Sequence, residues 1–95
     1  MQYEWDEKKR LANLIRHEID FAEAVNFEWD TSIEALDNRF DYGGERWVAL
    51  GFIDDRLYVM VYAFRPPNIR IISLRKANKR EILFYEKNSP KHSEK

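Results

Sequence analysis

With 95 residues, of which 35% are charged and 15% aromatic, the chain has room for one domain and is too rich in aromatic side chains to be disordered. The lack of cysteine excludes a disulfide framework and a thiolate zinc site, and no apolar run reaches the ~20 residues that span a bilayer. Residues 1–45 hold 5 Lys and Arg against 12 Asp and Glu, whereas residues 46–95 hold 11 against 5. Because clustered basic side chains attract phosphates, the second half predicts a polyanionic partner.

Two helices are predicted near the N-terminus. The first covers residues 7–17 after the N-cap Asp6, and an i, i+3, i+4 pattern gives it an apolar stripe that is expected to face the core. This stripe consists of Leu11, Leu14 and Ile15. The second helix covers residues 21–26, because Asp20 and Glu23 have the spacing of a capping box. The sequence before these helices has no signal-peptide character, which favours a cytoplasmic location.

The strongest pattern in the chain is a set of three apolar runs, at residues 47–53, 57–64 and 69–74. Short turn-forming segments join them, so they predict an antiparallel meander of three strands. The middle run is apolar on both faces, and each face therefore needs a cover. The weaker pattern between residues 26 and 44 allows further short strands and ends in a predicted turn at residues 41–44.

A C-terminal helix is predicted after Asn78, because Glu81 follows it at capping-box spacing. Its apolar residues are Ile82, Leu83 and Tyr85. We expect residues 1–87 to form a single domain and residues 88–95 to form a flexible tail. The predicted fold is α+β, with two N-terminal helices and one C-terminal helix packed on an antiparallel β-sheet of about four strands.

A basic segment, residues 70–81, joins the last strand to the C-terminal helix and is a candidate anion site. A helix N-terminus with nearby Arg and Lys side chains can hold a phosphate, although a solvated basic patch would look the same in the sequence. The basic residues of this segment are Arg70, Arg75, Lys76, Lys79 and Arg80. Arg46 and Arg65 lie at strand ends and are expected to converge with Arg75 on one side of the sheet, as a phosphorane transition state would need.

Three side chains are candidates for proton transfer. His17 has an ordinary pKa of about 6.5, which suits a base at neutral pH, but a histidine at a helix end can simply complement the helix dipole. Glu81 and Tyr85 lie one helical turn apart and face the same way, with a capping role and a core role as the alternatives. The sequence contains no metal-ligand spacing and no Gly-rich phosphate loop, so neither a metal nor a nucleotide cofactor is expected.

Two other groups of residues suggest binding roles. One is a possible stacking platform for unpaired bases, although core packing explains the same aromatic residues: Trp47, Tyr58, Tyr62 and Phe64. The other is a set of acidic residues that could attract a basic segment of a partner or repel polyanions, with surface solvation as the alternative. It consists of Glu28, Asp30, Glu34, Asp37 and Asp41.

Several short motifs occur in a specific order between residues 3 and 86. They are Trp5-Asp6-Glu7-Lys8-Lys9, Asn13-Leu14-Ile15-Arg16-His17, Ile19-Asp20-Phe21-Ala22-Glu23-Ala24, Glu45-Arg46-Trp47 with Gly51, and the run from Ile69 to Ala77 with Glu81 and Tyr85. Together they resemble the BrnT family of bacterial toxins. The chain departs from the family pattern at Arg16, where lysine is usual, and at Glu18, where glycine is usual. Asp54-Asp55 replaces the usual Asp-Gly turn, which the tolerance of Asp for positive φ accommodates.

The resemblance implies a RelE-like fold, a cytoplasmic ribonuclease that arrests translation, and a BrnA-type antitoxin that neutralises the toxin and binds DNA through its own domain. It implies RNA as substrate, and it allows the ribosome as a further partner and a homodimer within the toxin–antitoxin complex, while no membrane association is expected. The rival interpretations are a non-catalytic module that binds nucleic acid or protein, and a toxin of the RelE/ParE fold with a non-RNA target such as a topoisomerase.

The expected reaction is metal-independent cleavage of RNA that leaves a 2′,3′-cyclic phosphate. The candidate catalytic residues are His17, Arg46, Arg75, Lys76, Glu81 and Tyr85, and the candidate phosphate-binding residues are Arg65, Arg70, Lys79 and Arg80. The arginines and Lys76 would stabilise the phosphorane or hold flanking phosphates, while one of His17, Glu81 and Tyr85 would transfer the proton.

Overall fold

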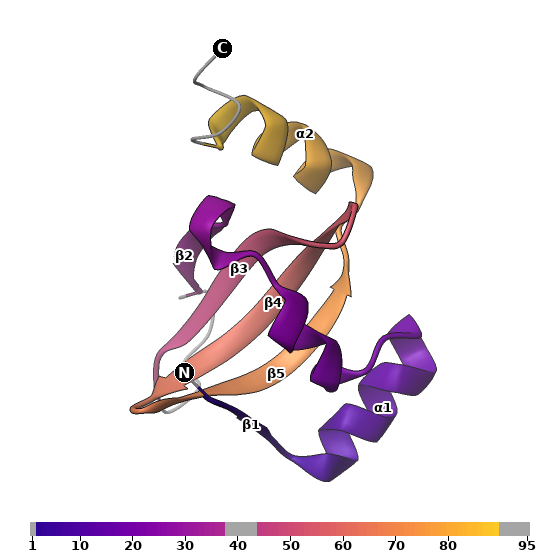
Figure 1. Ribbon diagram of the computed structural model, residues 1–95, viewed down its shortest axis with the longest axis vertical. Helices are drawn as coiled ribbons and strands as arrows, with labels where there is room; N and C mark the ends of the chain where they lie inside the picture. Colours follow the sequence, from indigo (N-terminus) through magenta and orange to yellow (C-terminus); the bar gives the residue numbers. More distant parts are fainter. Residues whose placement is uncertain (1, 38–43, 90–95) are drawn as a thin grey trace.

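The computed structural model describes residues 2–37 and 44–89 and contains one five-stranded sheet (Figure 1). The elements in chain order are β1 Gln2–Trp5, α1 Glu7–His17, the 3-10 helices η1 Phe21–Asn26 and η2 Trp29–Thr31, β2 Ile33–Asp37, β3 Arg46–Ile53, β4 Arg56–Arg65, β5 Asn68–Lys76 and α2 Lys79–Asn88. The α+β prediction is confirmed. No helix in the described ranges is long and apolar enough to cross a membrane.

The strands follow the order β1-β5-β4-β3-β2. The predicted meander is confirmed, because β3, β4 and β5 pair antiparallel in sequence. The expectation of a purely antiparallel sheet is wrong, since β1 pairs parallel with β5. β1 was not predicted, because four residues before a strong N-cap are too few to show a periodic pattern.

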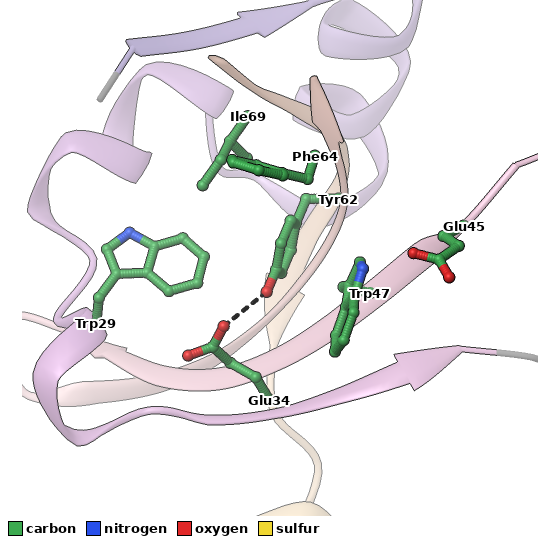
Figure 2. Close-up of a pocket in the computed structure, with 7 residues that line it drawn as sticks. All are labelled: Trp29, Glu34, Glu45, Trp47, Tyr62, Phe64 and Ile69. Atoms are coloured by element: carbon green, nitrogen blue, oxygen red, sulfur yellow. Dashed lines mark hydrogen bonds between the residues drawn. The ribbon is translucent and has the colours of Figure 1, made fainter. Parts of the chain in front are cut away.

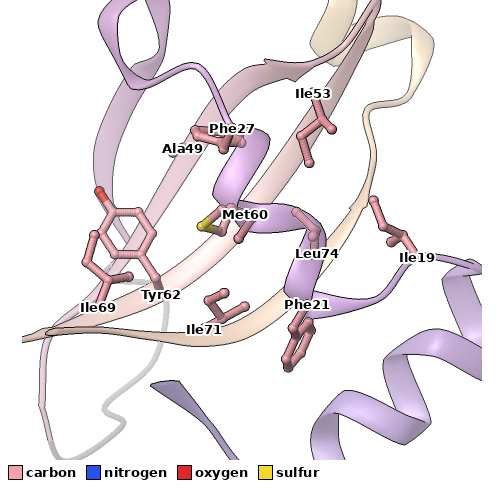
Figure 3. Packing of buried hydrophobic residues seen from close by; sticks show 11 residues of the cluster. Ile19, Phe21, Phe27, Ala49, Ile53, Met60, Tyr62, Ile69, Ile71 and Leu74 are labelled. Carbon is pink, nitrogen blue, oxygen red and sulfur yellow. The ribbon is translucent and has the colours of Figure 1, made fainter. Parts of the chain in front are cut away.

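Both faces of the sheet are covered, as the apolar middle strand requires. On one face, η1 and the segment after it bury Phe21, Ala24 and Phe27 against β3, β4 and β5 (Figure 3). On the other face, Ala77 and Tyr85 pack with residues of β3 and β4, namely Leu50, Leu57 and Val59. Gly51 lies against the Phe27 ring, which a Cβ atom at this position would overlap.

A register shift between Val61 and Tyr62 of β4 sets the direction of the side chains of β5. Val61 is opposite Ser73 and Tyr62 is opposite Ile71, so Ile72 is an extra residue on β5. Ile71 and Leu74 therefore both enter the core, although their odd spacing would place them on opposite faces of a regular strand. By the same shift, Arg75 faces the side of the sheet that α2 covers.

Helix α1 docks through a polar residue. Asn13 is buried, whereas Leu11 is 46% exposed and Ile15 is 83% exposed. The prediction that the apolar stripe of this helix faces the core is wrong. The Asn13 amide donates to the carbonyls of Leu74 (2.8 Å) and Ile19 (3.2 Å) and accepts from the Leu74 N–H (3.2 Å). β1 pairs with β5 only as far as Ile71, and the side chain of Asn13 thus replaces a neighbouring strand at Leu74.

The predicted helix starts are confirmed. Asp6 accepts from the N–H groups of Lys8 (2.8 Å) and Lys9, and Asn78 and Glu81 form a full capping box. Asp20 also caps its helix, but its carboxylate accepts from Ala22 at 3.0 Å, and the segment is a 3-10 helix. At the chain end the predicted tail is wrong for its first residues. Helix α2 extends to Asn88 and Ser89 is buried, while residues 90–95 lie outside the described range, as do residues 41–43 of the predicted turn.

Helix α1 ends at a residue in the left-handed conformation. Glu18 has φ 59° and ψ 31°, and its N–H donates to Leu14 at 2.9 Å. Asp54 in the hairpin between β3 and β4 also has positive φ, 54°. Glu18, where glycine is usual, thus keeps a backbone that favours glycine, whereas the positive φ of the hairpin falls on Asp54 and not on Asp55, which stands in the place of the usual glycine.

Replacing Glu18 by glycine is expected to raise the free energy of unfolding by about 1 kcal/mol, because a non-glycine residue in this region is strained by roughly 1–2 kcal/mol. Chemical denaturation monitored by circular dichroism would measure the change. Glu86→Gly, at an exposed position inside α2, should destabilise by about 1 kcal/mol instead. A destabilised Glu18→Gly variant would contradict this account of the helix end.

Candidate active site

A hollow of about 210 Å³ lies between α1 and β5. Its lining includes two cationic side chains and a histidine, and it consists of Lys9, Ala12, Asn13, Arg16, His17, Ile72 and Ser73. The helical residues recur at i, i+3, i+4, i+7 and i+8, so they share one face of α1. Asn13 fixes this face against β5, and the basic side chains beside it are thereby held at the sheet edge.

His17 is the last residue of α1 and is half-buried at the hollow. Burial lowers the pKa of its imidazole below the ordinary value, and the positive charges of Arg16 and Arg75 lower it further. A histidine with a lowered pKa is neutral at pH 7. His17 can therefore accept a proton in a strongly positive environment.

Arg75 projects from the end of β5 toward the start of α2. Its guanidinium donates to both carboxylate oxygens of Glu81, at 2.9 and 2.8 Å. Figure 1 shows the C-terminal end of α1, the end of β5 and the start of α2 on the same side of the molecule. The influence of Arg75 on the pKa of His17 agrees with this arrangement.

Glu81 is held by two partners. Arg75 lowers the pKa of its carboxyl group, and the Asn78 N–H, which donates to Glu81 at 2.8 Å, lowers it further. Asn78 in turn accepts from the Glu81 N–H at 2.9 Å. The capping box thus occupies part of the helix N-terminus that the sequence offers as an anion site. The cationic side chains around it are exposed: Lys76, Lys79 and Arg80.

The other predicted arginines lie at the opposite end of the sheet. Arg46, by the strand register, is level with Ala63 and Arg70, and Arg65 is level with Asn68. Arg75 is opposite Val59, four residues along β4 from Ala63, and is therefore roughly 13 Å away at ~3.3 Å per residue. These arginines share a side of the sheet with Arg75, as predicted, but the expected convergence is wrong.

At that opposite end the arginines have acidic neighbours. Arg70 donates to Glu4 at 2.9 Å, and hydrogen bonds from Asn68 and Arg70 lower the pKa of Glu4. Arg46 is the register partner of Asp37 on β2. This group therefore differs from the one around His17, where cationic side chains line a hollow.

Tyr85 lies in the core. It is 5% exposed, its hydroxyl donates to the Thr31 carbonyl at 2.7 Å, and its ring meets Phe52 edge-on at 5.4 Å. This hydrogen bond connects α2 with the segment before β2. Glu81, one turn before Tyr85, accepts from Arg75.

The structure adds residues that sequence reasoning missed. Lys9, Arg16 and Ser73 line the hollow beside His17. The signal for Lys9 and Arg16 was the spacing of polar residues along α1, which was hidden because the apolar residues of the same helix were assigned to the core. Within the described parts of the chain, no three His, Cys, Asp or Glu side chains are grouped so that they could hold a metal ion.

Three of the four residues of the predicted aromatic platform line one pocket, and the fourth, Tyr58, does not. Trp47, Tyr62 and Phe64 line a second pocket, on the face that η1 covers, together with Glu34 and Glu45 (Figure 2). Tyr62 is only 5% exposed, and Tyr58 is not among the residues that line this pocket. The carboxylates make this pocket a poor site for a nucleic acid, whose phosphates they would repel.

A family model described as the ribonuclease toxin BrnT of type II toxin–antitoxin systems matches residues 5–81. A search of curated proteins gave no match. The matched range contains α1 with His17, all of β5, and the start of α2 as far as Glu81. The chain therefore belongs to the BrnT family of ribonuclease toxins, whose partner within a type II system is an antitoxin protein.

Proposed function

We propose that this toxin, with a RelE-like fold, cleaves RNA in the cytoplasm by metal-independent transesterification. A base removes the proton of a ribose 2′-hydroxyl, and the oxygen attacks the adjacent phosphorus. The bond from phosphorus to the 5′-oxygen then breaks, and the departing oxygen takes up a proton from water, which leaves a 2′,3′-cyclic phosphate and a 5′-hydroxyl. The observation that carries the proposal is a histidine of lowered pKa at a cationic hollow.

His17 serves as the base in this scheme. The burial and positive charge that lower its pKa also keep it unprotonated at neutral pH. The same positive charge favours a bound phosphate, whose negative charge would raise the pKa of the imidazole as the substrate arrives. Substrate binding thus strengthens the base at the time when it is needed.

Arg75 serves as the main electrostatic group. As the phosphorane forms, negative charge grows on its oxygens, and a fixed guanidinium stabilises that charge without reorganisation. Lys9 and Arg16, which line the hollow beside His17, add positive charge to that of Arg75. Lys76, Lys79 and Arg80 are exposed nearby in the chain and suit phosphates that flank the cleaved bond.

Glu81 acts in this proposal as a positioning residue. Its carboxylate is ionised and receives two guanidinium hydrogen bonds, so it orients Arg75. Tyr85 receives no proton-transfer role, because its hydroxyl donates to Thr31 inside the core. Arg46, Arg65 and Arg70 lie at the far end of the sheet and at most guide a longer RNA.

Cleavage of RNA by this site would arrest translation, and a BrnA-type antitoxin would neutralise the toxin and carry the DNA-binding domain. Ribosome dependence can be tested in the same assay. An RNA that stays intact alone but is cut when translating ribosomes are added would place the ribosome in the substrate complex.

Arg75→Ala is expected to lower kcat/KM for RNA cleavage about 10²- to 10³-fold, the loss typical of a group that stabilises transition-state charge. Arg75→Lys should recover only part of this loss, because an ammonium lacks the bidentate geometry that Glu81 holds. Rates would be measured on a short labelled RNA after circular dichroism has established folding.

Arg70→Ala is the matched comparison for this experiment. Arg70 is also on β5, faces the same side, pairs with a glutamate and is similarly exposed, 33% against 35% for Arg75. Its removal should lower kcat/KM far less. Equal losses from the two variants would mean that general basic character, and not the site at His17, governs cleavage.

A further inference from the structure

The pocket lined by Trp29, Glu34, Glu45, Trp47, Tyr62, Phe64 and Ile69, here termed the aromatic pocket, has a volume of about 680 Å³. Its walls come from η2, β2, β3, β4 and Ile69 of β5, together with Glu45, which precedes β3. Figure 2 shows the indole rings of Trp29 and Trp47 on either side of Tyr62, with the Glu34 carboxylate between them.

The walls of the aromatic pocket are preformed. The Trp29 indole N–H donates to the Tyr3 hydroxyl at 2.7 Å, and the ring meets Tyr62 edge-on at 5.3 Å and Phe27 at 4.8 Å. Tyr62 is buried and donates its hydroxyl to Glu34 at 2.8 Å. A ligand would therefore lose little binding free energy to ordering these side chains.

The aromatic pocket is negatively charged. Of the described residues that line it, none is basic and two are glutamates. The two groups that donate to Glu34 in the structure are neutral hydroxyls, those of Tyr62 and Ser32. Burial and the Glu34 carboxylate raise the pKa of Tyr62, so this hydroxyl remains protonated and a donor.

One wall of the aromatic pocket reaches the surface. Phe64 is 61% exposed and lies beside the acidic residues. An exposed aromatic side chain that is surrounded by polar or charged residues is typical of a contact surface, since it buries apolar area when a partner binds. The pocket and its rim thus combine aromatic faces, two carboxylates and exposed apolar area.

We infer that the aromatic pocket receives an arginine side chain from a basic segment of the antitoxin. A guanidinium stacks on Trp and Tyr faces, and its N–H groups match carboxylates at the same time. A protein ligand fits better than RNA, because two glutamates repel phosphates whereas they attract a basic peptide. The antitoxin is the partner that the family provides, and the inference does not depend on the RNA chemistry proposed above.

The first test uses N-acetyl-arginine methylamide as a probe of the free toxin, with the norleucine analogue as the uncharged control. The chain has three tryptophans, and two of them line the aromatic pocket, so Trp5 is an internal reference. The indole N–H resonances of Trp29 and Trp47 are expected to shift on titration, with a dissociation constant on the order of millimolar, while Trp5 stays constant. Equal binding of the norleucine analogue would overturn the inference.

The second test neutralises the carboxylates. Glu34→Gln keeps an acceptor for the Tyr62 hydroxyl, so the double variant with Glu45→Gln should fold. It is expected to weaken binding of the arginine probe roughly fivefold and binding of the cognate antitoxin about tenfold. Glu86→Gln, an exposed glutamate of α2, is the matched control in the probe titration.

Two further outcomes would contradict the inference. An unchanged antitoxin affinity in the double variant would exclude the antitoxin as the occupant. A shift of Trp29 and Trp47 by a short single-stranded RNA that competes with the arginine probe would assign the pocket to RNA instead. Neither measurement uses cleavage, so the inference and the proposed ribonuclease mechanism can fail separately.

Discussion

Replacing His17 by alanine is expected to lower kcat/KM for RNA cleavage about 10²- to 10⁴-fold, the contribution typical of a positioned general base. The reason is that no other side chain combines contact with the hollow and a lowered pKa among the described residues. Stability should change little, because the imidazole is only half-buried at the end of α1. Single-turnover cleavage of a labelled RNA would measure the loss.

The pH profile and chemical rescue separate a base from a structural histidine. Since the pKa of His17 is lowered, kcat/KM of the wild-type protein should be constant at neutral pH and fall only as the pH drops below about 6.5, the ordinary value for histidine. Added imidazole should restore part of the activity of His17→Ala, and the pH dependence of the restored rate should follow the pKa of free imidazole. His92→Ala, which removes the only other histidine and lies outside the family match, is the control. A variant without histidine at residue 17 that cleaved RNA at the wild-type rate would exclude this base.

Replacing Asn13 by alanine is expected to lower the free energy of unfolding by about 3 kcal/mol, because three buried hydrogen bonds to Ile19 and Leu74 are lost together. At roughly 4–8 °C per kcal/mol for a domain of this size, Tm should fall by about 12–24 °C. Thermal unfolding monitored by circular dichroism would measure it.

Asn26→Ala removes an exposed asparagine from η1 and should shift Tm by only a few degrees. Asn13→Asp should be nearly as damaging as the alanine variant, since a carboxylate cannot donate to the carbonyls of Leu74 and Ile19. An Asn13→Ala protein as stable as the wild type would show that α1 is held by other contacts.

The sequence predicted the parts of the fold that depend on local chemistry. Asp6, Asp20 and Asn78 begin their helices because a side-chain oxygen next to a free N–H group acts within a few residues. The β3–β5 meander followed from long apolar runs with short turns between them. In contrast, β1 and the docking of α1 depend on β5, which lies more than sixty residues away in the chain.

The candidate site was predicted only in part, because residue type and local position are visible in the sequence whereas long-range contacts are not. His17, Arg75 and Glu81 stood out by residue type and local position, and the structure brings Arg75 to Glu81 and within electrostatic range of His17. The separation of Arg46 from Arg75 could not be predicted, because it depends on strand register and on the extra residue at Ile72. An alternating pattern without this bulge would place Arg70 and Arg75 on opposite faces.

The most direct test of metal-independent transesterification is the product formed from a short RNA in the presence of EDTA, compared with the same oligonucleotide carrying 2′-deoxyribose at the cleaved position. Purified toxin freed of antitoxin should cut only the ribose substrate, and mass spectrometry should find a 2′,3′-cyclic phosphate and a 5′-hydroxyl. Cleavage of both oligonucleotides, or a product with a 5′-phosphate, would contradict attack by the 2′-hydroxyl and remove the role proposed for His17.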